Sequence, residues 1–263
     1  MFIDSNEAKL FTTSYGSASL PTIVGIGGWI GSWELWAEPF SILSESWRTI
    51  AYDHRGSGAS LAPIQTITYD NLVADLFTVL DAYQVKECTL AAESAGALIA
   101  LGAALKDPGR IKRLVIVDGL YHRNMVSEAG DTFLNGLRVA YSATLDRFID
   151  LCIPEPNCEH IKRWGRQILD RASQESAIAL RNVGRGMDIR DKLSGIVQPT
   201  LILHGDMDNI VPIQQAHELH ALISGSKLAI FHGAGHVPTL TMPLKVAAGM
   251  SAFLKDLEPD RRA

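Results

Sequence analysis

The sequence predicts an α/β protein in which a mostly parallel sheet is flanked by helices. Short apolar runs that are typical of strands alternate with longer segments whose apolar residues recur at helical spacing, which is the pattern of a parallel sheet. This alternation stops after about residue 120, gives way to helical spacing alone until about residue 197, and then resumes. We therefore expect a core domain formed by residues 1–120 and 198–263, with a helical cap, residues 121–197, inserted between two core strands.

Each element of this core has its own local pattern. Strand-like runs predict strands over residues 9–15, 22–26, 47–52, 87–91, 113–117, 200–204 and 227–231. Apolar residues three and four positions apart predict helices over residues 71–83, 95–106, 213–222 and 244–257. We find no internal repeat and no low-complexity linker in the sequence, so we expect one α/β core that carries the insertion.

Composition argues against several classes of protein. Of the 263 residues, 47% are hydrophobic and 20% are charged, as is typical of a soluble globular protein. The net charge of −5 gives no sign of the positive surface that binds nucleic acid. Residues 1–10 lack the basic start and apolar centre of a signal peptide, and the longest apolar stretch, residues 95–105, is about half a membrane span. We expect a cytoplasmic protein, a monomer or a homodimer, with no membrane partner.

The cysteines give no sign of a disulfide framework or a metal site. There are three of them, Cys88, Cys152 and Cys158, so their number is odd and their spacing is wide. No C-x-x-C pattern is present. We expect reduced thiols, and we expect no bound metal.

The segment around Ser94 is the most informative stretch of the chain. A strand-like run ends in Ala92-Glu93-Ser94-Ala95-Gly96, and an Ala- and Leu-rich helical segment follows at once. Small residues allow the sharp strand-to-helix turn that exposes a serine hydroxyl, as in the G-x-S-x-G motif, although Ala92 replaces its first glycine. A serine that caps a core helix is the alternative interpretation.

A glycine-rich segment offers a second alternative, a dinucleotide-binding fold. Residues 25–31 contain four glycines after a strand-like run, and Asp53 closes the next strand. The spacing misses G-x-G-x-x-G, because Ile30 occupies the position of the third glycine, and Trp29 would crowd a phosphate. We therefore regard a dinucleotide-binding oxidoreductase as the weaker hypothesis.

Two later segments favour a hydrolase instead. Asp208 follows the predicted strand 200–204, and His236 lies in a loop of small residues after the predicted strand 227–231. Both would reach the carboxyl edge of a parallel sheet, where Ser94 also lies. The order Ser94, Asp208, His236 is the chain order of one class of serine hydrolases. Asp118, which ends another predicted strand, is the alternative acid.

The chain resembles the α/β-hydrolase fold superfamily over nearly its whole length. The resemblance is carried by the turn at Ser94 and by Gly27-Gly28-Trp29, Asp53-His54-Arg55-Gly56-Ser57-Gly58, Gly205-x-x-Asp208-x-x-Val211-Pro212 and Gly233-x-Gly235-His236-x-Pro238. The family often has His-Gly where this chain has Gly27-Gly28, and this departure removes no catalytic group. The resemblance implies an eight-stranded type of sheet, a helical cap and a reaction without a cofactor.

The chemistry of serine hydrolases assigns roles to these residues. Ser94 would be the nucleophile, His236 the base that takes its proton, and Asp208 the acid that orients the imidazole. The backbone N–H of Ala95, the residue after the nucleophile, would stabilise the oxyanion. The resemblance supplies Trp29 as the second N–H donor.

Aromatic residues near this edge predict a fairly apolar substrate pocket. The candidates are Trp29, Trp33, Tyr121, His122 and Trp164. We therefore expect a cofactor-free hydrolase of a small-molecule carboxylic ester or lactone. Three alternatives stay open, namely a carbon–carbon bond hydrolase of the meta-cleavage type, a cofactor-free haloperoxidase-like enzyme, and a ligand receptor on a hydrolase scaffold.

Overall fold

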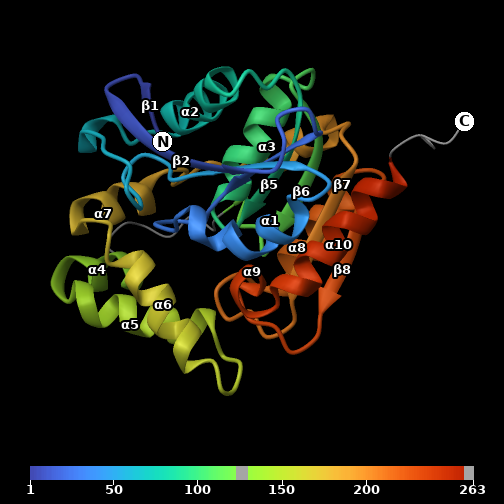
Figure 1. The fold of residues 1–263 in the computed structure, drawn as a ribbon. Helices are drawn as coiled ribbons and strands as arrows, with labels where there is room; N and C mark the ends of the chain where they lie inside the picture. The colour runs from blue at the N-terminus through green and yellow to red at the C-terminus, as the bar shows by residue number, and fades with distance from the viewer. Residues whose placement is uncertain (123–129, 258–263) are drawn as a thin grey trace, which may run out of the picture.

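The computed structural model describes residues 1–122 and 130–257, and it contains one eight-stranded sheet (Figure 1). The strands lie in the order β1-β2-β4-β3-β5-β6-β7-β8. Their bounds are Phe2–Ser5 for β1, Ala8–Tyr15 for β2, Thr22–Ile26 for β3, Arg48–Tyr52 for β4, Cys88–Glu93 for β5, Ile111–Val117 for β6, Thr200–Gly205 for β7 and Lys227–Phe231 for β8. Strands β1 and β2 pair antiparallel, β2 also pairs antiparallel with β4, and every other pairing is parallel.

The strand register brings the carboxyl ends of the central strands to one edge of the sheet. Ile26 at the end of β3 pairs with Ala92 of β5, and Glu93 at the end of β5 pairs with Val117 of β6. All six residues of β5 are buried, as are all six of β7. Strands covered on both faces read as continuous apolar runs, which is why they stand out in the sequence.

Helices pack on the sheet and bury it. The helices of this layer are α1 (Ala37–Leu43), α2 (Tyr69–Ala82), α3 (Gly96–Lys106), α8 (Ile213–Leu222), α9 (Pro238–Thr241) and α10 (Pro243–Asp256), with short 3₁₀ turns η1 (Trp33–Trp36) and η2 (Ile64–Thr66). Helix α1 packs against α10 and β4, whereas α3 packs against α2 and the central strands. Within the described residues, no helix combines the length and the apolarity that a bilayer crossing requires.

The connection from β6 to β7 carries a group of helices of its own. These are α4 (Thr132–Val139), α5 (Tyr141–Cys152), α6 (Glu159–Leu169) and α7 (Gln174–Asn182), followed by the turn η4 (Arg190–Gly195). Helix α4 packs against α5 and α7, and α5 packs against α6. In Figure 1, α4, α5 and α6 lie together below the body that contains the sheet.

The fold class expected from the sequence is confirmed, with a few differences in the elements. All seven predicted strands and all four predicted helices are present, with bounds that differ by at most two residues. The sequence analysis missed β1, α1 and α9, because each is seven residues or shorter and gives no periodic signal. The division into a core domain and a cap stays a prediction, and residues 123–129 of the predicted cap lie outside the described residues.

Candidate active site

Ser94 lies on the sharp turn between β5 and α3. Its φ of +51° is in the left-handed region, where a non-glycine residue is strained. The turn depends on close packing, since a Cβ at Gly96 would lie 2.6 Å from the carbonyl oxygen of Gly27. The expected strand–serine–helix arrangement is therefore present, and Ser94 is not a simple helix cap.

Ser94, His236 and Asp208 form a continuous chain of hydrogen bonds. The Ser94 Oγ lies 2.8 Å from Nε2 of His236, and Nδ1 of His236 lies 2.7 Å from Oδ2 of Asp208. Because an ionised carboxylate only accepts hydrogen bonds, Nδ1 carries the proton and Nε2 is free to accept from the serine hydroxyl. The side chains of His236 and Asp208 are 2% and 0% exposed, so bulk water does not compete with these bonds.

Backbone donors and charge keep Asp208 ionised. Its Oδ1 accepts hydrogen bonds from the N–H groups of Ile210 at 2.7 Å and Val211 at 2.9 Å. Burial acts to raise the pKa of Asp208, but the charge and hydrogen bond of His236, with these backbone donors, lower it overall. Burial likewise opposes protonation of His236, yet Asp208 and the charge of Glu93 raise the pKa of the imidazole above its ordinary value.

Asp118, the alternative acid, has a different environment. Its Oδ1 accepts a hydrogen bond from the N–H of Gly205 at 2.8 Å. Burial, and then the negative charge of Asp208, hold the pKa of Asp118 well above its usual range. Two neighbouring carboxyl groups whose pKa values are pushed apart take different roles. Here the pKa of Asp208, which is hydrogen bonded to His236, is lowered, and the pKa of Asp118 is raised.

Two backbone N–H groups are available beside Ser94. Within the described residues, no protein acceptor is hydrogen bonded to the N–H of Trp29 or of Ala95. Ala95 is the residue directly before helix α3, so the positive end of the helix dipole increases the positive potential at its N–H. Both residues are those that the sequence analysis proposed as oxyanion donors.

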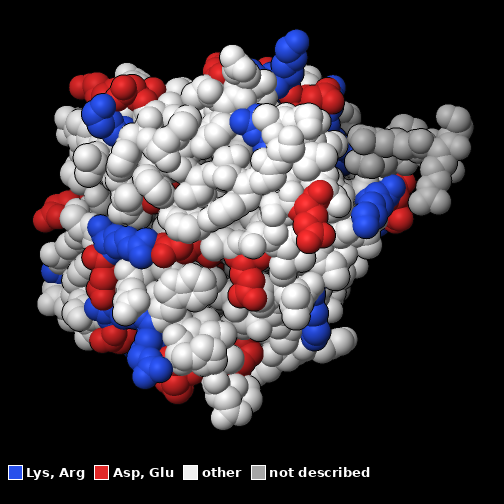
Figure 2. Space-filling view, in the orientation of Figure 1, with Lys and Arg blue, Asp and Glu red and all other residues white. Residues whose placement is uncertain are grey.

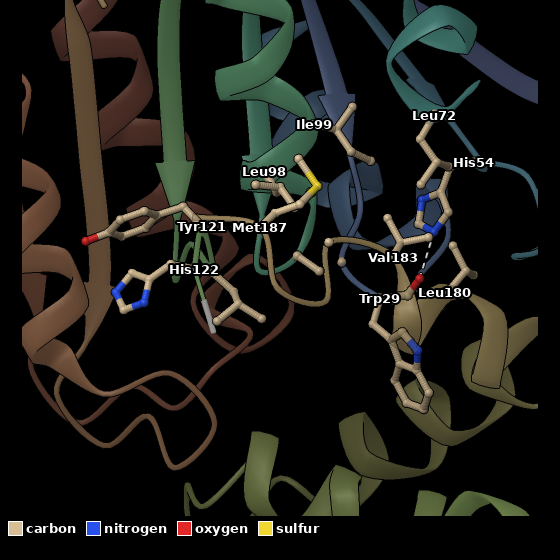
Figure 3. Close-up of a pocket in the computed structure, with 15 residues that line it drawn as sticks. Trp29, His54, Leu72, Leu98, Ile99, Tyr121, His122, Leu180, Val183 and Met187 are labelled. Carbon is tan, nitrogen blue, oxygen red and sulfur yellow. Dashed lines mark hydrogen bonds between the residues drawn. The ribbon is translucent and has the colours of Figure 1, made fainter. Parts of the chain in front are cut away.

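The loop that carries Trp29 is held on both sides by buried side chains. The N–H of Gly28 donates to Oε2 of Glu93 at 2.9 Å, and Nε2 of His54 lies 2.7 Å from the carbonyl oxygen of Trp29. Burial raises the pKa of Glu93 to about 7 and lowers the pKa of His54. His54 is therefore neutral and donates from Nε2 to the carbonyl of Trp29 (Figure 3).

A first cavity opens beside these donors. It holds about 530 Å³ of empty space, and its lining is mostly apolar. Figure 3 shows Trp29, Tyr121 and His122 among its lining residues, together with Val183 and Met187 from the segment after α7. Of the five predicted pocket residues, three therefore line this cavity.

A second cavity contains the nucleophile itself. It holds about 490 Å³ of empty space, and Ser94 and His236 both line it. Helices α5 and α6 form much of its wall, through residues that include Phe148, Ile149 and Ile168. Gly28 and Trp29 line both cavities, so the two meet at the loop that carries Trp29.

Trp33 and Trp164 line neither cavity. The N–H of Trp33 donates to Oδ1 of Asp53 at 2.7 Å, so this residue closes a turn of the core. Trp164 lies on α6, near the carboxylate of Glu34. Helix α6 instead presents Gly165 and Ile168 to the second cavity, because they lie on a different face of the helix.

One group of side chains in the described part of the chain has the spacing of a metal site. It consists of Asp118, His204 and Asp208, whose possible ligand atoms all lie within 4.8 Å of one another. These groups already have partners, since Asp208 is bonded to His236 and Nε2 of His204 lies 3.0 Å from the carbonyl oxygen of Val211. The group is best described as the support of Asp208, and it gives no reason to assign a metal.

The contacts of several residues of the site have no signal in the sequence. The sequence analysis did not find the roles of His54 and Glu93 in holding the Trp29 loop, nor the contribution of Phe148 to the second cavity. Glu93 and His54 lie inside recognised motifs, so their positions were visible but their contacts were not. Phe148 belongs to an ordinary amphipathic helix, and nothing in its spacing distinguishes it from a core residue.

Comparison with known proteins identifies the family of this chain. Residues 21–163, more than half of the chain, match the family model described as alpha/beta hydrolase fold. The chain belongs to this family. It is 28% identical to a pimeloyl-[acyl-carrier protein] methyl ester esterase of Aliivibrio salmonicida, over 89% of this chain and 92% of that protein.

Two further similarities cover almost the whole chain. A 3-oxoadipate enol-lactonase of Acinetobacter baylyi is 25% identical, over 98% of both proteins. The crystal structure of a bromoperoxidase from Bacillus anthracis superposes with a TM-score of 0.89 at 25% identity, over 97% of this chain and 99% of that one. This alpha/beta hydrolase carries the site described above.

Proposed function

We propose that this protein is a serine hydrolase that cleaves a carboxylic ester or lactone through an acyl-enzyme at Ser94. The observation that carries the proposal is the Ser94–His236–Asp208 chain of hydrogen bonds, with two free N–H groups beside the hydroxyl. The names of the relatives, an esterase and an enol-lactonase, support the same class, a hydrolase of ester bonds.

Acylation uses each group in turn. As Ser94 Oγ attacks the carbonyl carbon, its proton passes to Nε2 of His236, and the Asp208 carboxylate stabilises the imidazolium that forms. The carbonyl oxygen becomes an oxyanion and accepts hydrogen bonds from the N–H groups of Trp29 and Ala95, each worth about 3–4 kcal/mol of barrier. His236 then gives the proton to the leaving alkoxide, and the acyl group stays on Ser94.

Deacylation repeats these steps with water as the nucleophile. His236 takes a proton from a water molecule, which attacks the acyl carbon, and the acid leaves as Ser94 recovers its proton. For a lactone, the leaving alkoxide is part of the acyl group, so one hydroxy acid is released.

The linings of the two cavities support a separate position for each half of an ester. His236 has to reach the leaving oxygen, and only the second cavity has His236 in its lining. The alcohol therefore occupies the second cavity, and the acyl chain passes the N–H groups of Trp29 and Ala95 into the first. Both linings are mainly apolar, so the fitting substrate is an apolar ester or lactone of small to medium size.

Helices α4–α7 form a cap in this proposal. Helices α5 and α6 wall the second cavity, and residues of α7 and the segment after it, among them Leu180 and Val183, wall the first. The cap would select the substrate and exclude water from the reacting atoms.

The central test is the variant Ser94→Ala. It removes only the nucleophilic oxygen, so hydrolysis of p-nitrophenyl acetate should fall by on the order of a thousandfold or more while the fold persists. A serine-directed organophosphate should add its mass to the peptide that contains Ser94. Substantial turnover in a folded Ser94→Ala protein would contradict the proposal.

A substrate panel separates the remaining alternatives. Simple aryl esters and lactones are compared with ring-fission diketones and with halide oxidation by peroxide. Faster turnover of the diketones would indicate a carbon–carbon bond hydrolase, and halide oxidation would indicate a haloperoxidase-like enzyme. Tight binding of a ligand with almost no turnover would indicate a receptor.

A further inference from the structure

The loop that carries His236 is attached to the segment that ends helix α5. The N–H of His236 donates to the carbonyl oxygen of Cys152 at 2.8 Å. Next to it, the N–H of Gly235 donates to Oε1 of Glu155 at 2.7 Å. The same Oε1 accepts from the hydroxyl of Thr241, in α9, at 2.8 Å. Three hydrogen bonds thus join residues 152–155 to both sides of the histidine.

The two segments approach too closely for any side chain at residue 235. A Cβ there would lie 2.4 Å from Cδ of Pro154 and 2.5 Å from the carbonyl oxygen of Cys152. Glu155 is only 8% exposed, although it belongs to a polar stretch between α5 and α6. Both donors reach Oε1, whereas Oε2 is buried with no hydrogen-bond partner among the described residues. Burying a carboxyl group is costly, and these two donors offset part of the cost.

The same segment lines the cavity of the nucleophile. Ile149, Cys152 and Ile153 face the second cavity, and the chain then continues directly to Glu155. The position of His236 is therefore set partly by the core, through Asp208, and partly by the insertion between β6 and β7. We propose that Glu155 is a positioning residue that acts through His236, fixing the histidine loop against the end of α5.

This proposal rests on the proposed function, since it assigns His236 the role of base. An imidazole that moves by a fraction of an ångström loses its alignment with Ser94 Oγ, and misplacement of about 1 Å can cost about a hundredfold in rate. Glu155 touches neither the substrate nor the reacting atoms. Its loss should therefore lower kcat and leave KM nearly unchanged.

The first experiment compares three variants by steady-state hydrolysis of p-nitrophenyl acetate, with the melting temperature of each measured in parallel. Glu155→Ala should lower kcat by about 10- to 100-fold with KM within about threefold of the wild-type value. Glu155→Gln keeps an oxygen for both donors and should restore most of kcat. The control, Glu159→Ala, removes a cap carboxylate that is 78% exposed and should leave kcat unchanged.

The second experiment repeats Glu155→Ala in a His236→Ala background. The residual rate there does not use the imidazole, so Glu155→Ala should change it less than about twofold. A structural role for Glu155 would lower this residual rate as well, and that result would overturn the proposal. If Glu155→Ala does not fold, Thr241→Val removes one donor alone and should lower kcat by about three- to tenfold. Wild-type kcat in Thr241→Val would then overturn the proposal.

The failures of the two proposals are distinguishable. Turnover that is independent of both Ser94 and His236 would overturn the proposed function. Turnover that requires both residues, with wild-type kcat in a folded Glu155→Ala protein, would overturn only the role of Glu155.

Discussion

At the scale of single residues, the site contains two neighbouring carboxyl groups whose pKa values are shifted in opposite directions. Asp208 and Asp118 are both buried beside the same loop, yet the pKa of Asp208 is lowered and that of Asp118 is raised. The difference follows from their partners, because His236 supplies positive charge to Asp208, whereas Asp118 faces the negative charge of Asp208. The sequence left both aspartates open as the triad acid, and the hydrogen bond at 2.7 Å from Asp208 to His236 favours Asp208.

This assignment predicts a clear ranking of two variants. Asp208→Asn should lower kcat by on the order of 10³- to 10⁴-fold, because an amide cannot hold the imidazole in the productive tautomer. Asp118→Asn should have a much smaller effect, since the imidazole is hydrogen bonded to Asp208, whereas Asp118 accepts from the backbone N–H of Gly205. Steady-state hydrolysis of an aryl ester at one pH measures both. The reverse ranking would assign the acid to Asp118.

The raised pKa of His236 predicts the pH dependence of hydrolysis. The base works only when neutral, so kcat/KM should rise with pH and reach half of its maximum above pH 6.5, the ordinary value for histidine. Activity should be lost as the pH falls through this value.

Glu93→Gln should move this half-maximum to lower pH, because the negative charge of Glu93 contributes to the raised pKa of His236. The variant Asp256→Asn, which alters an exposed ion pair with Lys227, is the control and should leave the profile unchanged. A half-maximum that stays in place in Glu93→Gln would show that the charge of Glu93 does not reach the imidazole.

At the scale of elements, the sequence predicts the core strands and the turn at Ser94 well, and it predicts the contacts of the insertion between β6 and β7 less well. Strands such as β5 and β7 give continuous apolar runs because both of their faces are buried, and the turn at Ser94 has a local motif. The contact of Glu155 with Gly235 joins residues 80 positions apart, and neither residue has a periodic or motif signal for it. Trp164 illustrates the opposite error. It lies on α6, a helix that lines the second cavity, but its side chain is not on the helix face that lines the cavity.

The division of the substrate between the two cavities predicts opposite changes in selectivity. Val183→Phe should fill part of the first cavity and lower kcat/KM for a hexanoate ester relative to an acetate ester by about tenfold. Ile149→Phe should instead reduce the preference for a bulky alcohol, because Ile149 lines the second cavity. The rate at which a small organophosphate labels Ser94 should stay within a few fold of the wild-type rate in both variants. If both variants change selectivity for the same half of the ester, the acyl chain and the alcohol do not occupy the two cavities as proposed.

At the scale of the whole molecule, Trp29 links the loop after β3 to the helices inserted between β6 and β7. Trp29 lines both cavities, and its indole N–H donates to the carbonyl oxygen of Ala177 in α7 at 2.9 Å. Its ring also packs edge-on against Phe133 of α4 and Phe148 of α5, at 5.0 and 5.3 Å between ring centroids. On the face shown in Figure 2, acidic and basic residues are mixed, and the visible charged groups form no large patch of a single charge.

The amino-terminal part of the sheet is attached to the core by a buried ion pair. Arg55 and Asp75 are both 0% exposed, with Nε and Nη2 of the arginine 2.7 and 2.6 Å from the two carboxylate oxygens. Ser5, at the end of β1, donates to the same carboxylate at 2.7 Å. The pair therefore connects the turn after β4, helix α2 and the edge strand.

Breaking this pair should destabilise the whole protein rather than the site alone. Asp75→Asn keeps the shape of the side chain but leaves the charge of Arg55 buried and unpaired, which should lower the free energy of unfolding by about 3–5 kcal/mol. The matched control is Asp4→Asn in the exposed pair of Lys9 and Asp4, whose side chains are 59% and 83% exposed, where the loss should be about 1 kcal/mol or less. Urea denaturation followed by tryptophan fluorescence measures both values. Equal losses in the two variants would show that burial of the Arg55–Asp75 pair does not control stability, and the attachment of β1 to α2 would then have to depend on apolar packing.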